Sequence, residues 1–163
     1  MYNRGWGLLP PLCEGTELMS QPIRILIADN DLNFATELKW FLDQQEDLKV
    51  VDIVRDGQGA VSSCKDTLPD VVLMDLRLPV LDSIKATQSI LVQNERIKVL
   101  TTSAIANDRY ALEAVKAGAC GYLEKDSAFD IIASTIRQVA GGDVCLNPAL
   151  AASILEEFHR LTP

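Results

Sequence analysis

The stretch Val71-Val72-Leu73-Met74-Asp75 is a run of four apolar residues that ends in a carboxylate. The run is too short for a helix and predicts a strand that is buried on both faces. Such strands occur in parallel sheets that helices cover on both sides. In an open sheet of this kind, ligands bind outside the carboxyl ends of the strands. The acidic residue at the end of the run is therefore the first candidate for a functional site.

Similar short runs recur along the chain and predict four more strands, at residues 23–28, 50–54, 99–102 and, more weakly, 121–123. Alternation of strands and helices at a period of about 25 residues implies right-handed βαβ crossovers. The predicted fold is α/β, a doubly wound parallel sheet of five strands. Apolar residues at helical spacing predict the helix faces Phe34, Leu38, Phe41 and Leu42; Ile84, Ile90 and Leu91; Ala111, Leu112, Ala114 and Val115; and Ile131, Ile132, Ile136 and Val139.

The chain divides into three parts by composition. Residues 1–22 carry glycines and prolines without a helical or strand period, which predicts an extended leader. Residues 23–142 hold the five strand–helix units and form the predicted domain. Residues 143–163 contain a further amphipathic stretch at 148–158, for which Asn147 is the expected N-cap. This stretch predicts an extra C-terminal helix.

Charge and cysteine content exclude several classes of function. The net charge is −8, and no stretch gathers the lysines and arginines that bind a nucleic-acid backbone. Cys13, Cys64, Cys120 and Cys145 are scattered, which argues against a disulfide framework or a zinc site. No apolar run approaches the length of a membrane span. We expect a cytoplasmic location, no membrane contact and no DNA binding by this segment itself.

Polar side chains follow the strands at the edge where ligands bind. The set combines a carboxylate nucleophile, oxygen ligands for a hard divalent cation, a hydroxyl donor and a fixed cation. Phosphoryl transfer needs these groups, because its catalysis is mostly positioning and charge neutralisation. Magnesium prefers oxygen ligands and keeps several waters, so one or two carboxylates suffice. The residues are Asp29, Asn30 and Asp31 after the first strand, Asp75 after the third, Ser103 after the fourth, and Tyr122 and Lys125 at the fifth.

Three motifs resemble receiver domains of two-component response regulators. They are residues 23–30 (IRILIADN), residues 71–75 (VVLMD) with Pro79 four residues on, and residues 117–125 (AGACGYLEK). The similarity covers roughly residues 23–142. It implies a flavodoxin-like (βα)5 fold and an aspartate that accepts a phosphoryl group from the phosphohistidine of a sensor histidine kinase. By position, that aspartate is Asp75.

The resemblance also implies roles for the residues near Asp75. Lys125 would pair with the phosphoryl oxygens, Ser103 would be the switch hydroxyl, and Tyr122 would be the aromatic residue that moves inward when Ser103 engages the phosphate. Thr101 and Thr102 are rivals for the hydroxyl role. Ser103 is preferred because its distance along the chain to Lys125 matches the receiver pattern.

The resemblance implies a magnesium site, and here the sequence departs from the family. Receivers usually carry two adjacent acids after the first strand, whereas the second position here is Asn30. The expected protein ligands are Asp29, Asn30, Asp75 and the backbone carbonyl of Arg77, and Asn30 predicts weak binding of Mg2+. Asp31 could compensate in part, but it is more easily explained as a helix N-cap.

A second departure concerns Ser83, which follows Asp82 where the family usually has glycine. We expect the loop beside the site to be less free to adopt positive φ at this position.

The C-terminal part resembles one subfamily. Residues 141–148 (GGDVCLNP), a helix and then Leu161-Thr162-Pro163 are similar to the linker of NarL/FixJ-type regulators, in which a LuxR-type helix-turn-helix domain begins with a similar motif. The resemblance implies a transcriptional regulator that binds DNA only through an output domain missing from this chain. A stand-alone receiver is the alternative, and a homodimer is possible for either.

Two other functions compete with the phosphorylated switch. The first is a pseudo-receiver, a binding module that is regulated without phosphorylation. The second is a phosphatase similar to haloacid dehalogenases, but those enzymes carry an Asp-x-Asp motif and here Leu76 and Arg77 follow Asp75. We expect no classical enzyme, only slow self-phosphorylation from small donors and self-dephosphorylation.

Overall fold

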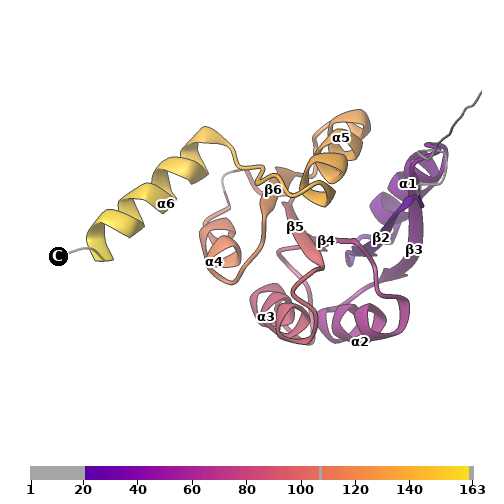
Figure 1. The fold of residues 1–163 in the computed structure, drawn as a ribbon, viewed down its shortest axis with the longest axis horizontal. Helices are drawn as coiled ribbons and strands as arrows, with labels where there is room; N and C mark the ends of the chain where they lie inside the picture. The colour runs from indigo at the N-terminus through magenta and orange to yellow at the C-terminus, as the bar shows by residue number, and fades with distance from the viewer. Residues whose placement is uncertain (1–20, 107, 162–163) are drawn as a thin grey trace, which may run out of the picture.

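Five parallel strands form one sheet in the order β3-β2-β4-β5-β6 (Figure 1). The structure is a computed structural model and describes residues 21–106 and 108–161. The predicted sheet is confirmed, and most strands are one or two residues longer than predicted. The predicted leader lies almost wholly outside the described residues. The strands are β2 (Ile23–Ala28), β3 (Leu48–Val54), β4 (Val71–Asp75), β5 (Lys98–Ser103) and β6 (Gly121–Glu124).

Helices cover both faces of the sheet. In Figure 1, α1 and α5 lie on one side, and α2, α3 and α4 lie on the other. None of the described helices is long and apolar enough to cross a lipid bilayer. The helices are α1 (Leu32–Asp43), α2 (Gly57–Thr67), α3 (Ser83–Gln93), α4 (Tyr110–Lys116), α5 (Phe129–Ala140) and α6 (Pro148–Leu161).

The alternation of side chains along each strand feeds two separate cores. In β2, Ile25 and Ile27 pack with residues of α1 and α5, whereas Leu26 and Ala28 pack with residues of α2, α3 and α4. All four side chains are fully buried. Successive residues of a strand point to opposite faces, so a sheet buried on both sides needs apolar residues throughout. This is why the strands read as continuous apolar runs.

Side-chain caps begin four of the helices. The carboxylate of Asp31 accepts a hydrogen bond from the backbone N–H of Phe34, at 3.1 Å, and the amide oxygen of Asn147 accepts one from Leu150, at 2.8 Å. Both N-caps were expected from the sequence and are confirmed. Asp56 and Asp82 cap α2 and α3 in the same way. Each cap satisfies a backbone donor that a helix start leaves unpaired.

Helix α2 had no predicted apolar face. It carries two glycines in its first turn and several polar residues, and its buried apolar side chains are only Ala60, Val61 and Cys64. Small side chains give a weak periodic signal, so the Asp56 cap and packing against the sheet define this helix. One other boundary differs from prediction: α6 continues to Leu161, beyond the predicted stretch 148–158.

Ser83 does not adopt positive φ in the loop after β4, in line with the expectation for serine at this position. This residue begins α3, and its hydroxyl donates a hydrogen bond to the backbone carbonyl of Asp75. The loop nevertheless contains a residue with positive φ, Val80, at 71°. The loop packs tightly on α2 at Gly57. A Cβ atom added to this glycine would lie only 1.8 Å from the carbonyl oxygen of Leu81.

Val80 gives a stability prediction. A β-branched residue at positive φ is strained, and this side chain is 82% exposed, so it has little packing to lose. We expect Val80→Gly to raise the free energy of unfolding by about 1 kcal/mol in chemical denaturation, since the relieved strain exceeds the added entropy of the unfolded chain.

Val92 provides the matched control. It is 87% exposed and lies in α3 with helical backbone geometry. Val92→Gly should lower the free energy of unfolding by about 0.5 kcal/mol, because glycine is a poorer helix former than valine. Equal losses of stability for the two variants would contradict the assignment of strain to Val80.

Candidate functional site

One ammonium group contacts two carboxylates at the carboxyl edge of the sheet. The Nζ atom of Lys125 lies 2.9 Å from Oδ2 of Asp29 and 3.6 Å from Oδ2 of Asp75. The side chain of Lys125 is only 11% exposed, and its Nζ also lies 4.7 Å from the centre of the Phe34 ring. The structure thus brings together three residues that the sequence singled out from three different strand ends.

The strand order explains this meeting. Asp29 follows β2 and Asp75 is the last residue of β4, and these two strands are neighbours although β3 lies between them in sequence. The chain therefore reverses its winding direction between β2 and β4, and ligands bind at such a point in open α/β sheets. Lys125 follows β6, and its backbone N–H donates to the carbonyl of Ser103 at 2.8 Å.

Burial and charge shape the titration of this group. Burial raises the pKa of Asp29, and the nearby charge of Asp75 raises it further; hydrogen bonds from Lys125 and from the Asp31 backbone only partly offset this. Burial would lower the pKa of Lys125, but the hydrogen bond and charge of Asp29 and the charge of Asp75 outweigh it and raise that pKa. Lys125 is therefore a fixed cation at neutral pH.

Asp75 is held in place by its neighbours. Its Oδ1 atom accepts a hydrogen bond from the backbone N–H of Arg77 at 3.0 Å, and its own carbonyl accepts the Ser83 hydroxyl. The backbone N–H of Leu76 bonds to the carbonyl of Thr102 at 2.8 Å. The side chain keeps 9% of its surface exposed, so one side of the carboxylate meets solvent.

Ser103 is fully buried at the end of β5. Its hydroxyl donates to Oδ2 of Asp108 at 2.7 Å and accepts from the backbone N–H of Ile105 at 3.0 Å. The hydroxyl of its rival Thr101 donates to the carbonyl of Gly121 at 2.9 Å, inside the sheet. This contact ties Thr101 to β6, whereas the partners of Ser103 lie in the segment that leads to α4.

Tyr122 already lies inside the protein. The residue is 4% exposed, and its hydroxyl donates to the carbonyl of Ile105 at 3.1 Å and accepts from the backbone N–H of Asp108 at 3.4 Å. Burial raises the pKa of the Tyr122 phenol. The inward position that was expected only after phosphorylation is therefore the position in this structure, and the predicted movement stays a prediction.

Asp108 is a site residue that sequence reasoning missed. Its side chain is fully buried and accepts hydrogen bonds from Ser103, from the backbone N–H of Tyr110, and from two nitrogens of Arg77, at 3.2 Å (Nε) and 3.1 Å (Nη2). Burial alone would raise the pKa of Asp108, but these hydrogen bonds and the charge of Arg77 lower it. The Arg77 guanidinium also lies 4.6 Å from the centre of the Tyr110 ring.

The residues at this edge fit a hard divalent cation that needs few protein ligands. Asp29 and Asp75 share one ammonium partner, and Asn30 is exposed directly beside Asp29. Within residues 21–106 and 108–161, no cluster of three or more histidine, cysteine, aspartate or glutamate side chains could hold a metal ion. Two carboxylates suit Mg2+, which retains much of its water shell, and do not suit a metal that requires a full protein cage.

Comparison with known proteins identifies the family. A family model for the response regulator receiver domain matches residues 25–137. The chain belongs to the response regulator receiver domain family. This receiver domain is 35% identical to the transcriptional regulatory protein LnrK of Bacillus subtilis, over 85% of its own length and 63% of LnrK. It spans about three fifths of the length of the curated relatives it matches, at 63%, 59% and 63% for three of them.

Solved structures agree with this assignment. A two-component response regulator of the LuxR family from Aurantimonas sp. SI85-9A1 matches with a TM-score of 0.75 and 28% identity, over 85% of this receiver domain and 99% of that chain. The receiver domain of the sensor histidine kinase PA1611 from Pseudomonas aeruginosa matches with a TM-score of 0.67 and 28% identity, over 74% and 99%. That structure contains a magnesium ion in its active-site cleft.

The family, the flavodoxin-like fold and the resemblance to NarL/LuxR-type regulators are thus confirmed. Members of this family are signalling proteins and not classical enzymes, as expected from the sequence.

Asn30 provides a test of the cation site. Asn30→Asp should tighten Mg2+ binding about tenfold, or about 1.4 kcal/mol, because it adds a third carboxylate beside Asp29. Isothermal titration calorimetry measures this change directly. The control is Asp31→Asn, which alters an exposed neighbouring acid and keeps a good N-cap residue for α1. A cation site here would be contradicted if Asp31→Asn bound Mg2+ more tightly than the wild type, or if Asn30→Asp showed no gain in Mg2+ affinity.

The raised pKa of Asp29 predicts the pH dependence of Mg2+ binding. The carboxylate must be deprotonated to bind a cation, so affinity is complete above this pKa and is lost as the pH falls through it. Because the pKa lies above the ordinary value of 3.8, the loss should begin at a higher pH than for an unperturbed aspartate. Titrations between neutral pH and 3.8 test this, and constant affinity down to the ordinary range would disprove it.

Proposed function

We propose that this receiver domain accepts a phosphoryl group on Asp75 from the phosphohistidine of a sensor histidine kinase. The observation that carries the proposal is the pair of contacts that Lys125 makes with Asp29 and Asp75, at the edge of the sheet where the chain reverses its winding direction. An ammonium group held beside a carboxylate that is not fully buried suits in-line phosphoryl transfer. The ammonium can neutralise charge on the transferred group without moving far.

In the proposed reaction, a carboxylate oxygen of Asp75 attacks the phosphorus atom of the phosphohistidine. An O–P bond forms, the P–N bond breaks, and its electron pair stays on the imidazole nitrogen of the kinase. The product is an acyl phosphate on Asp75. The Lys125 ammonium pairs with the phosphoryl oxygens, and the Arg77 backbone N–H, 3.0 Å from Oδ1 of Asp75, helps to orient the carboxylate.

We assign the Mg2+ site to Asp29, Asn30, Asp75 and the backbone carbonyl of Arg77. When bound, the ion would supply positive charge for the phosphoryl oxygens during transfer. Only two of these proposed ligands are carboxylates, which supports a low affinity for Mg2+. Asp29 contributes a charged oxygen that Lys125 and the backbone N–H of Asp31 already hold in position.

The output of the switch is proposed to be transcriptional. Phosphorylation would draw Ser103 toward the phosphoryl group, rearrange the segment between β5 and α4 near Tyr122, and change a partner or dimer face. The transcriptional relatives support this reading, with DNA binding through a helix-turn-helix domain beyond this chain and α6 as the linker. A cytoplasmic location agrees with the composition.

Asn30 and Ser83 depart from the family pattern, but the other residues at the sheet edge argue against the alternative functions. A pseudo-receiver would have no need for a nucleophile, a fixed cation and a hydroxyl at one sheet edge, and Asp75, Lys125 and Ser103 supply all three. A haloacid-dehalogenase-like phosphatase would need a second acid two residues after Asp75, where Arg77 stands.

Phosphorylation by a small donor tests the proposal. Incubation of the purified chain with acetyl phosphate and Mg2+ should add one phosphoryl mass to the wild type and none to Asp75→Asn, because the amide is not a nucleophile for this transfer. The matched control is Asp82→Asn, which changes an exposed aspartate close by and keeps an N-cap residue for α3.

Intact-protein mass spectrometry gives the result. Phosphorylation of Asp75→Asn, or its absence in the wild type, would refute the function. Sustained turnover of a phosphate ester would point to the phosphatase instead.

A further inference from the structure

Ser103 can serve only one acceptor at a time. A serine hydroxyl carries a single hydrogen, and in this structure that hydrogen is given to Oδ2 of Asp108, at 2.7 Å. The hydroxyl oxygen meanwhile accepts from the backbone N–H of Ile105. A phosphoryl oxygen on Asp75 would need the same hydrogen. The fully buried carboxylate of Asp108 and the phosphoryl group therefore compete for one donor.

We propose that Asp108 is a positioning residue that holds Ser103 in the resting state and opposes its transfer to the phosphoryl group. The proposal rests on the function proposed for Asp75. It adds that Asp108 influences the equilibrium between the resting and the phosphorylated arrangement of Ser103. Asp108 is suited to this role because its carboxylate is a stronger acceptor than a neutral group in the same position.

The remaining contacts of Asp108 allow Ser103 to leave. Arg77 donates two hydrogen bonds to Asp108, and the backbone N–H of Tyr110 donates a third. A buried carboxylate that lost its only partner would be strongly destabilised, but Asp108 keeps three donors after Ser103 departs. The transfer thus exchanges one hydrogen bond for another without leaving a bare buried charge.

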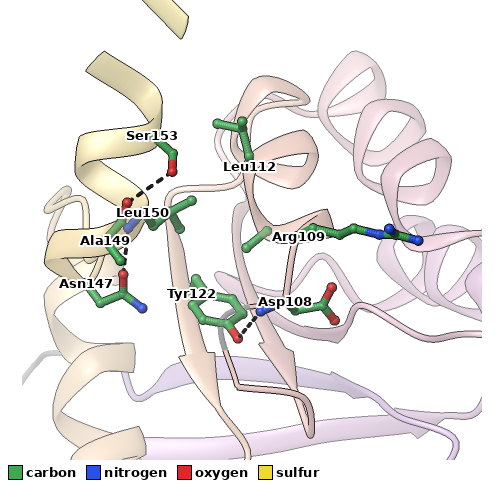
Figure 2. A pocket seen from close by; sticks show the side chains of 9 residues that line it. Asp108, Arg109, Leu112, Tyr122, Asn147, Ala149, Leu150 and Ser153 are labelled. Atoms are coloured by element: carbon green, nitrogen blue, oxygen red, sulfur yellow. Dashed lines mark hydrogen bonds between the residues drawn. The ribbon is translucent and has the colours of Figure 1, made fainter. Parts of the chain in front are cut away.

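Asp108 and Tyr122 also lie close to the start of helix α6. Its backbone N–H donates to the Tyr122 hydroxyl at 3.4 Å, and both residues line a cavity of about 210 Å³ between α4, β6 and α6 (Figure 2). Asn147, Leu150 and Ser153 of the α6 segment form the opposite wall. A shift of the segment around Asp108 would therefore change the surface on which the start of α6 packs.

Beryllofluoride, which mimics the phosphoryl group, tests the proposal in the presence of Mg2+. Asp108→Ala should bind beryllofluoride about threefold to tenfold more tightly than the wild type, the range that one lost competing hydrogen bond provides. A merely structural role would not raise the affinity, because a loosened site binds more weakly. The control is Glu113→Ala, which removes an exposed negative charge of α4 and should change the affinity less than twofold.

A double-mutant cycle assigns the effect to Ser103. In a Ser103→Ala background the competition no longer exists, so adding Asp108→Ala should give no further gain in affinity. If the gain persists without Ser103, the release of Arg77 or the loss of charge is responsible, and the proposal is overturned.

The remaining outcomes separate the two proposals. Failure of the wild type to bind beryllofluoride would overturn both, whereas normal wild-type binding with no gain in Asp108→Ala would overturn only the role of Asp108. Circular dichroism and thermal unfolding check that the variants fold. If Asp108→Ala does not fold, Asp108→Asn replaces it, because the amide removes the charge at nearly the same volume; it should show a smaller gain, and no gain would overturn the proposal.

Discussion

The Lys125 ammonium holds together two buried carboxylates that would otherwise repel each other. It lies 2.9 Å from Asp29 and 3.6 Å from Asp75, and all three groups are largely withdrawn from water. Charges in such surroundings interact strongly, so the position of this one cation controls the stability of the whole edge. The parallel sheet makes the contact possible, because it brings the ends of β2, β4 and β6 to the same side.

A second charged network extends this centre toward the helices. Ser103 at the end of β5 bonds to Asp108, and Asp108 in turn bonds to Arg77 and to the first turn of α4. Two main-chain hydrogen bonds join the networks: the Arg77 N–H donates to Oδ1 of Asp75, and the Lys125 N–H donates to the carbonyl of Ser103. A change of charge at Asp75 thus has a short covalent and hydrogen-bonded route to α4.

The predictable parts of the fold are those with a strong local signal. The five strands were predicted because a sheet covered on both faces needs uninterrupted apolar runs, and the caps at Asp31 and Asn147 because short polar side chains before an amphipathic stretch favour helix starts. Helix α2 escaped prediction because small residues give little periodicity. The positive φ of Val80 was not predicted, because packing of the loop against Gly57 determines its path.

The sequence by itself determined the succession of strands and helices along the chain and the polar residue types that end each strand. Hydrophobic periodicity and strand ends are local properties, so both can be seen in the sequence. These local features alone point to Asp29, Asp75 and Lys125. Only the tertiary structure decided which of these groups touch, and that Ser103 donates to Asp108. That pairing depends on where Asp108 lies relative to the end of β5, and such a long-range contact between buried polar groups leaves no periodic pattern in the sequence.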